Sequence, residues 1–270
     1  MPADVIDYRI IGDDMQGVII TLDPNEAVFA EAGAMMYMED GIAMDTVFGD
    51  GSSQQRGFWG KLVGAGKRLV TGESLFTTVF SNQGNGKRKL AFAAPYPGTL
   101  IPVHLPDVGG TLICQKDSFL CAAKGVSLGI EFQRKLGVGL FGGEGFVMQR
   151  LEGDGLAFIH AGGTLYERDL QPGEILRVDT GCIVALTRSV SYDIQYVGGL
   201  KSALFSGEGL FFAVLQGPGK VWLQSLPLSR MANRIVMAAP AIGGRSSEQG
   251  SLLGGVAAGG LLGGILGDDE

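Results

Sequence analysis

The chain has 270 residues, of which 46% are hydrophobic, 18% are charged and 45 are glycine. This length can bury a large apolar core, and glycine without a collagen period indicates many tight turns. The net charge of −7 argues against a nucleic-acid partner, because phosphate binding depends on clustered lysine and arginine.

The N-terminal residues indicate a cytoplasmic chain. Residues 1–16 are acidic and have neither a basic region nor a long apolar stretch, so we expect no signal peptide. The three cysteines, Cys114, Cys121 and Cys182, lie in apolar runs without CxxC spacing. Such thiols behave as small hydrophobic side chains in a reducing compartment.

A pattern of apolar runs and turns recurs three times along the chain. Matching blocks occur at residues 24–38, 109–123 and 172–186, and each predicts two short strands joined by a tight turn. A second set of blocks, at 74–94, 145–161 and 209–225, predicts a β-hairpin in each copy. Gly-Glu pairs precede these hairpins, and the first copy carries an insertion that we place within residues 45–61.

This period predicts an all-β fold. We expect three antiparallel β-sandwich-like repeats at about residues 5–95, 96–161 and 162–238, arranged around a pseudo-threefold axis. Three small sandwiches and one threefold barrel both fit the pattern. A Gly-rich tail, residues 241–270, follows the repeats.

The tail repeats glycine every four residues, at Gly255, Gly259, Gly263 and Gly267. On a helix these glycines would form a groove for close contact with another helix. The apolar stretch 252–267 would span about 24 Å as a helix, which is short of the ~30 Å of bilayer hydrocarbon. Three interpretations remain: a flexible appendage, a helix that self-associates, or attachment to a membrane surface.

The three Gly-Glu pairs place Glu73, Glu144 and Glu208 at equivalent positions. Carboxylates that converge near an axis could bind a cation. We favour a structural role, in which each glutamate accepts hydrogen bonds from turn amides, because no second ligand type repeats beside it.

The usual catalytic motifs are absent or out of context. Residues 137–142 match GxGxxG, but a strand pattern follows where a dinucleotide site needs a helix. His104 and His160 lack metal-ligand spacing, and no nucleophile elbow is recognised in the chain. We therefore predict no catalytic residue, no metal site and no cofactor, so the chain is not expected to be an enzyme.

Several segments of the sequence resemble those of one known family. Residues 30–46 (AEAGAMMYMEDGIAMDT), 67–82 (KRLVTGESLFTTVFSN) and 97–105 (PGTLIPVHL) are similar to the bacterial branch of the altered-inheritance-of-mitochondria biogenesis family, long counted among domains of unknown function. The resemblance covers residues 4 to about 238. It implies a fold similar to the tryptophan RNA-binding attenuation protein, with three β-sandwich units around a pseudo-threefold axis. The mitochondrial relatives are implicated in inner-membrane organisation, and the resemblance carries over no catalytic residues.

The expected function is a scaffold or interaction module that forms homo-oligomers in the cytoplasm. A membrane surface or a membrane protein is the second expected partner. One alternative is a small-ligand-binding protein with a pocket between repeats, lined by Phe58, Trp59 and Trp222. Another is an enzyme whose site is assembled from distant strands around His104 and His160.

Overall fold

The computed structural model describes residues 2–48, 76–134, 146–196 and 211–238. The chain divides into two compact units, Met1–Asn233 and Arg234–Glu270. In the described part of the chain, strands dominate and every pairing between named strands is antiparallel. This confirms the all-β prediction.

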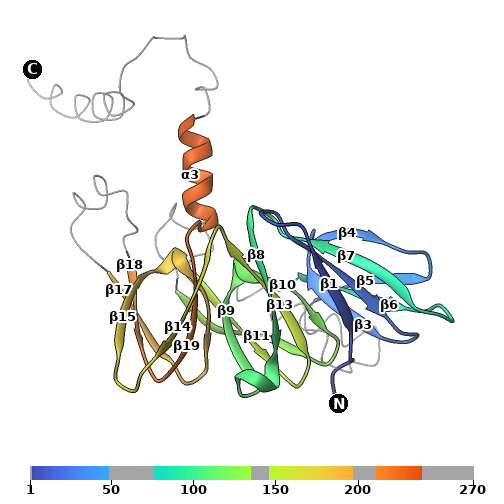
Figure 1. Cartoon of the computed structure of the whole chain (residues 1–270), viewed down its shortest axis with the longest axis horizontal. Coiled ribbons are helices and arrows are strands. Elements are labelled where there is room, and N and C mark those ends of the chain that lie inside the picture. The colour runs from blue at the N-terminus through green and yellow to red at the C-terminus, as the bar shows by residue number, and fades with distance from the viewer. Residues whose placement is uncertain (1, 49–75, 135–145, 197–210, 239–270) are drawn as a thin grey trace, which may run out of the picture. The chain divides into compact units, whose positions relative to one another are not determined.

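The strands form four sheets, which can be followed in Figure 1. In order across each sheet, the first contains β1 (Asp7–Ile11), β2 (Gly17–Leu22), β7 (Arg88–Ala93) and β4 (Met35–Met38). The second contains β5 (Ile42–Phe48), β6 (Phe76–Asn82), β3 (Ala27–Glu31), β10 (Phe119–Ala123), β13 (Leu156–Gly162) and β8 (Gly98–His104). The third contains β11 (Ser127–Arg134), β12 (Phe146–Glu152), β9 (Thr111–Gln115), β16 (Ile183–Thr187), β19 (Gly219–Gln224) and β14 (Leu165–Leu170). The fourth contains β15 (Ile175–Asp179), β18 (Phe211–Gln216) and β17 (Ser191–Tyr196).

Short helical elements complete the described chain. Three 3-10 turns, η1 (Leu105–Val108), η2 (Lys116–Ser118) and η3 (Thr180–Cys182), connect strands. One α-helix, α3 (Leu228–Ala238), follows the last strand.

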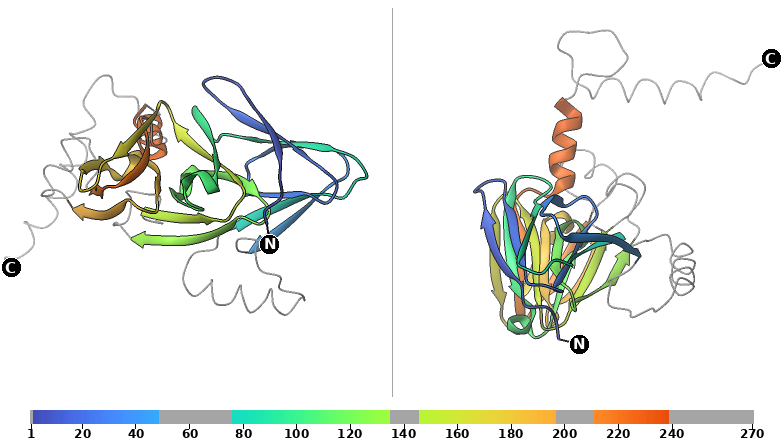
Figure 2. Two further views of the ribbon diagram at one scale, coloured as in Figure 1. Left: turned by 60° about the horizontal axis from the view of Figure 1, so that its bottom comes forward. Right: turned by 90° about the vertical axis from the view of Figure 1, so that its right-hand side faces the viewer.

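Apolar side chains between successive sheets form three cores. The first and second sheets enclose a core that includes Leu90 and Phe158. The second and third enclose one that includes Ile159 and Trp222. The third and fourth enclose one that includes Leu215. Figure 2 shows the sheets from two further directions. Both faces are therefore buried at the centres of the two middle sheets, which explains why all of β9 and β10 and most of β16 are buried without alternation.

The predicted hairpins are wrong, although the predicted strands exist. β6 belongs to the second sheet and β7 to the first, and the same separation holds for β12 with β13 and for β18 with β19. The predicted pairs β3–β4, β9–β10 and β15–β16 are separated in the same way. Each short connection is therefore a corner between two sheets.

Asn82 shows how one corner is held. Its side-chain amide donates to the carbonyl oxygens of Leu22 and Gly86, both at 2.9 Å, and its Oδ1 accepts from the Gly84 amide at 2.9 Å. Because all these partners lie at or beside the turn between β6 and β7 or on β2, the bonds fix the path of the chain from one sheet to the next.

β1 and β2 form a hairpin, and three further hairpins with longer connections pair β5 with β6, β11 with β12 and β17 with β18. The connections of these three are residues 49–75, 135–145 and 197–210. The first is the longest, in agreement with an insertion in the first copy. The three Gly-Glu pairs fall in these connections, outside the described residues.

One irregularity recurs at the same place in three strand pairs. A bulge interrupts the pairing of β4 with β7 between Met35 and Tyr37. The pairings of β10 with β13 and of β16 with β19 have the same bulge, between Phe119 and Cys121 and between Ile183 and Ala185 respectively. We call residues that these bulges align counterparts. The pseudo-threefold axis and the repeat boundaries stay predictions.

Candidate interaction edges

The two middle sheets are each joined at their centre by one strand pair, which we call a seam. In the second sheet, β10 pairs with β3 and places Cys121 opposite Ala30 and Ala122 opposite Phe29. In the third sheet, β16 pairs with β9 and places Ala185 opposite Cys114 and Leu186 opposite Ile113. All five residues of β9 and of β10 are buried, and four of the five are buried in β3 and in β16.

Two strands are equivalent to seam strands but end their sheets. β4 is the counterpart of β10 and β16, and it pairs only with β7 among the described strands. β16 begins four positions after β15 ends, just as β4 begins four positions after β3 ends and β10 four positions after β9 ends. Among the described strands, β15 pairs only with β18. These two strands are the candidate interaction edges.

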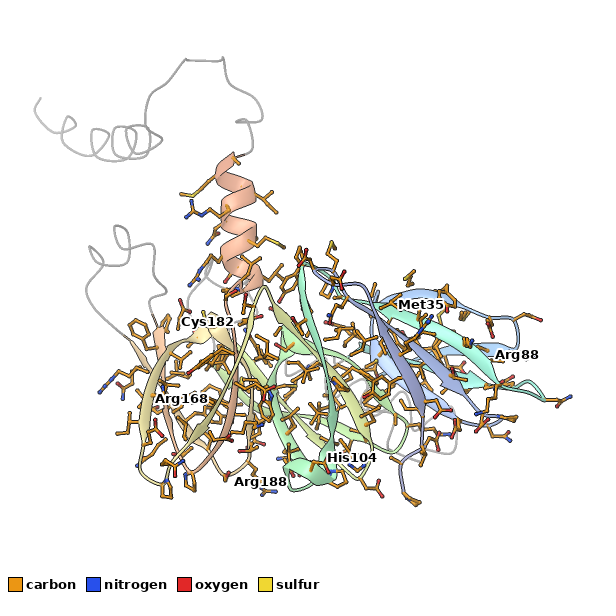
Figure 3. All side chains as sticks on the ribbon, in the orientation of Figure 1. Met35, Arg88, His104, Arg168, Cys182 and Arg188 are labelled. Atoms are coloured by element: carbon orange, nitrogen blue, oxygen red, sulfur yellow. The ribbon has the colours of Figure 1, made fainter. Side chains whose placement is uncertain are left out.

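The candidate edges expose apolar side chains that are buried in the seams. On β4, Met36 is 57% exposed and both Met35 and Met38 are also exposed, whereas on β15 Ile175 is 55% exposed. Figure 3 labels Met35 on β4. An edge strand also presents free backbone donors and acceptors, so it can pair with a further strand. The edges offer hydrogen bonds and apolar area, without a reactive group.

The helix α3 is a second exposed apolar feature. None of its eleven residues is buried, and Leu228, Met231 and Ile235 recur at helical spacing along one side. Its charged residues are Arg230 and Arg234, so the helix is positively charged. In the first unit, Arg230 forms an ion pair with Asp179, with Nη2 and Oδ2 3.6 Å apart.

Trp222 is the one residue of the predicted ligand pocket that the structure describes. It is 4% exposed and lies in the core between the second and third sheets, with the Lys220 ammonium 5.6 Å from its ring centroid. Phe58 and Trp59 lie outside the described residues, so the pocket stays a prediction.

Two other groups of predicted site residues also lie outside the described residues. They are the repeated acids Glu73, Glu144 and Glu208 and the tail glycines Gly255, Gly259, Gly263 and Gly267. Their proposed roles in turns and in tail self-association stay predictions.

The two histidines lie on paired strands but are not opposite each other in the register. On β8 and β13, His104 is opposite Leu156, whereas His160 is opposite Leu100, four residues further along. His104 is exposed, and its Nδ1 lies 3.2 Å from Asp107 Oδ1.

His160 is buried against Tyr96, with ring centroids 4.5 Å apart. Among the described residues, no partner forms a hydrogen bond of good geometry with either ring nitrogen. Burial lowers the pKa of His160 to about 4, and the Tyr96 backbone offsets only part of this effect. The ring is therefore neutral at pH 7, and its environment is that of a core residue.

The cysteines behave as the sequence predicts. Cys114 and Cys121 are buried in cores, and Cys182 is half-buried. Burial raises the pKa of Cys114 to about 12 and also raises that of Cys121, which keeps both thiols protonated.

The described ranges contain neither a cluster of metal ligands nor a helix that could span a membrane. No cluster of three or more His, Cys, Asp or Glu side chains there is arranged to hold a metal ion. No helix there is long and apolar enough to cross a bilayer.

Sequence reasoning did not find the candidate edges. The apolar run of Met35, Met36 and Met38 looks like any other buried strand, because a strand pattern does not say which strand ends a sheet. The number of predicted repeats could have indicated them. If three repeats are joined one after another through paired strands, the first and the last repeat each keep one joining strand without a partner.

Known proteins are similar to this chain in sequence and in fold. The family model described as mitochondrial biogenesis AIM24 matches residues 8–226. An uncharacterised protein of Streptococcus pyogenes serotype M6 is 32% identical over 222 residues, which are 81% of this chain and 84% of that protein. A crystal structure of a Streptococcus pyogenes protein aligns with a TM-score of 0.68 and 24% identity, over 87% of this chain and 100% of that one. The structural likeness is one of fold.

Proposed function

The chain belongs to the mitochondrial biogenesis AIM24 family, and from that premise we propose that it is a non-enzymatic scaffold that associates with copies of itself. The resemblance noted in the sequence is thereby confirmed at the level of the family. The scaffold role is our proposal for this member.

The observation that carries the proposal is the pair of candidate edges. β4 and β15 have apolar side chains exposed to water, whereas their counterparts in the seams are buried. Burying apolar area stabilises an association by about 25 cal/mol per Å². Pairing of the free backbone groups adds direction to that association.

The double substitution Met36→Lys with Met38→Lys tests the proposal. We expect the wild-type chain to have a mass in solution that is a multiple of 28.3 kDa. The variant should be a 28.3 kDa monomer, because charged lysines on an edge strand oppose pairing. Both side chains are exposed, so the substitution leaves the cores intact. Light scattering coupled to size-exclusion chromatography measures the mass.

A matched control is Met15→Lys, which changes another exposed methionine that lies outside β4 and β15. This variant should keep the wild-type mass. A wild-type chain that is monomeric at tens of micromolar, on the order of the concentration in such experiments, contradicts the proposal. Deletion of residues 241–270 shows separately whether the tail is needed.

A second candidate function, attachment to a membrane surface, is favoured by α3. Its apolar side and its two arginines suit a helix that lies in the headgroup region of anionic lipid. Attachment and self-association are compatible, since they use different elements.

The substitution Ile235→Asp tests the attachment. It should weaken co-sedimentation with vesicles of phosphatidylcholine and phosphatidylserine by at least about tenfold, because a buried apolar side chain contributes about 1.5–3 kcal/mol. The matched control Asn233→Asp makes a similar change of charge on the polar side of the helix and should bind more tightly than Ile235→Asp. Equal binding by the two variants, or no binding by the wild-type chain, rules out attachment through α3.

A further inference from the structure

We infer that the exposed strand β4 of one copy pairs antiparallel with β15 of a second copy, with Tyr37 opposite Val178, Met38 opposite Arg177 and Glu39 opposite Leu176. This inference rests on the proposed self-association and specifies its geometry. The occupant of each edge is the other edge of an identical chain.

The seams supply the template for this pairing. Both join a strand of the β3 type to a strand of the β10 type, antiparallel and in the same register. The shared bulge aligns Tyr37 with Cys121 and Ala185.

The strands on the other side of the seams are aligned by their equal spacing. The strand that follows begins four positions after the end of β3, β9 and β15, with three residues between them. Val178 is therefore the counterpart of Ala30 and Cys114. Since Cys121 is opposite Ala30 and Ala185 is opposite Cys114, Tyr37 should be opposite Val178.

The two edges of one chain are too far apart to pair with each other. β15 lies with β17 and β18 at one end of the first unit, and β4 lies with β7 at the other (Figures 1 and 2). The second strand must come from another copy. Each contact then uses β4 of one copy and β15 of the next. A row of copies therefore has a free β4 at one end and a free β15 at the other, until the assembly closes into a ring.

One residue distinguishes the new contact from the seams. Arg177 is exposed and stands where the other two strands have Phe29 and Ile113, which are buried. A charged residue on an edge strand prevents indiscriminate pairing. The edge is thus soluble by itself, while the exposed Ile175 still supplies an apolar contact.

Disulfide trapping tests the register. In a Cys182→Ser background, the double variant Met38→Cys with Arg177→Cys places two exposed thiols directly opposite each other across the contact. Mild oxidation should give a ladder of covalent multimers on a non-reducing gel. The double variant Met38→Cys with Ile175→Cys is two residues out of register and should cross-link at least about tenfold less, because disulfides need a Cα separation of roughly 4.4–6.8 Å.

The single variants decide between pairing modes. Under the inference, neither Met38→Cys nor Arg177→Cys alone forms a covalent dimer. A dimer of Met38→Cys alone shows that β4 pairs with β4, which overturns the inference. Oligomers by light scattering without any ladder also overturn the inference and leave the scaffold proposal standing, whereas a monomeric wild-type chain removes both.

Discussion

Acidification from pH 7 to pH 5 should destabilise the wild-type chain by about 2 kcal/mol more than it destabilises the variant His160→Gln. Folding lowers the pKa of His160 from 6.5 to about 4 through burial. As the pH falls below 6.5, the unfolded chain binds a proton at this site before the folded chain does, so stability is lost. The loss is complete only below pH 4 and totals about 3.5 kcal/mol, at ~1.4 kcal/mol per pKa unit.

Glutamine is a suitable replacement because the protein already uses it at the counterpart position. His160 and Gln224 each follow a residue paired at the shared bulge, Ile159 and Leu223. The Gln224 side chain accepts from the Gly162 amide and donates to the Gly181 carbonyl oxygen, both at 2.8 Å. An uncharged amide therefore fits this part of the fold.

Urea denaturation between pH 5 and 7.5, at one fixed protein concentration, gives the free energies of unfolding. The matched control is His104→Gln, which removes the exposed histidine and leaves His160 in place, so its acid loss should equal that of the wild-type chain. Parallel curves for the wild-type chain and His160→Gln contradict the prediction.

Replacing Phe158 with alanine should cost about 3–5 kcal/mol of folding free energy. The side chain is fully buried in the core between the first and second sheets. Its ring makes an edge-to-face contact with Tyr8 at 5.0 Å between centroids. The strand is held on both sides, with Pro102 and Cys121 opposite Phe158, so the backbone is not free to fill the cavity.

Tyr166→Ala is the control for this substitution. Tyr166 is also an aromatic residue in a strand, but it is 54% exposed, so its loss should cost less than about 1 kcal/mol. Urea midpoints measured at one protein concentration compare the two variants. If Phe158→Ala is no less stable than Tyr166→Ala, then the core between the first two sheets does not have the packing described above.

The sequence predicted strands well because burial and turns leave local patterns. The block 24–38 contains β3 and β4, and the block 74–94 contains β6 and β7. It did not predict the partner of each strand. Two apolar runs joined by a Gly turn fit a hairpin and a corner between sheets equally, and the choice here depends on distant contacts such as that of Asn82 with Leu22.

The candidate edges could not be predicted from local sequence patterns either, because they also depend on which strands pair. Met38 and its counterparts Ala122 and Leu186 are all apolar, yet only Met38 is exposed, because exposure depends on whether a neighbouring strand exists. Trp222 shows the converse. It was predicted to line a ligand pocket between repeats, and in the fold most of its surface is covered by the core.

The seams also determine which segments of this chain could fold on their own. Because β3 is joined to β10 and β9 to β16, each middle sheet combines strands from both sides of a predicted repeat boundary. A chain divided at the sequence boundary between copies would lose the central strand pair of a sheet and uncover two edges. The predicted repeats are therefore not separate units of folding, because strands from both sides of each predicted boundary share a sheet.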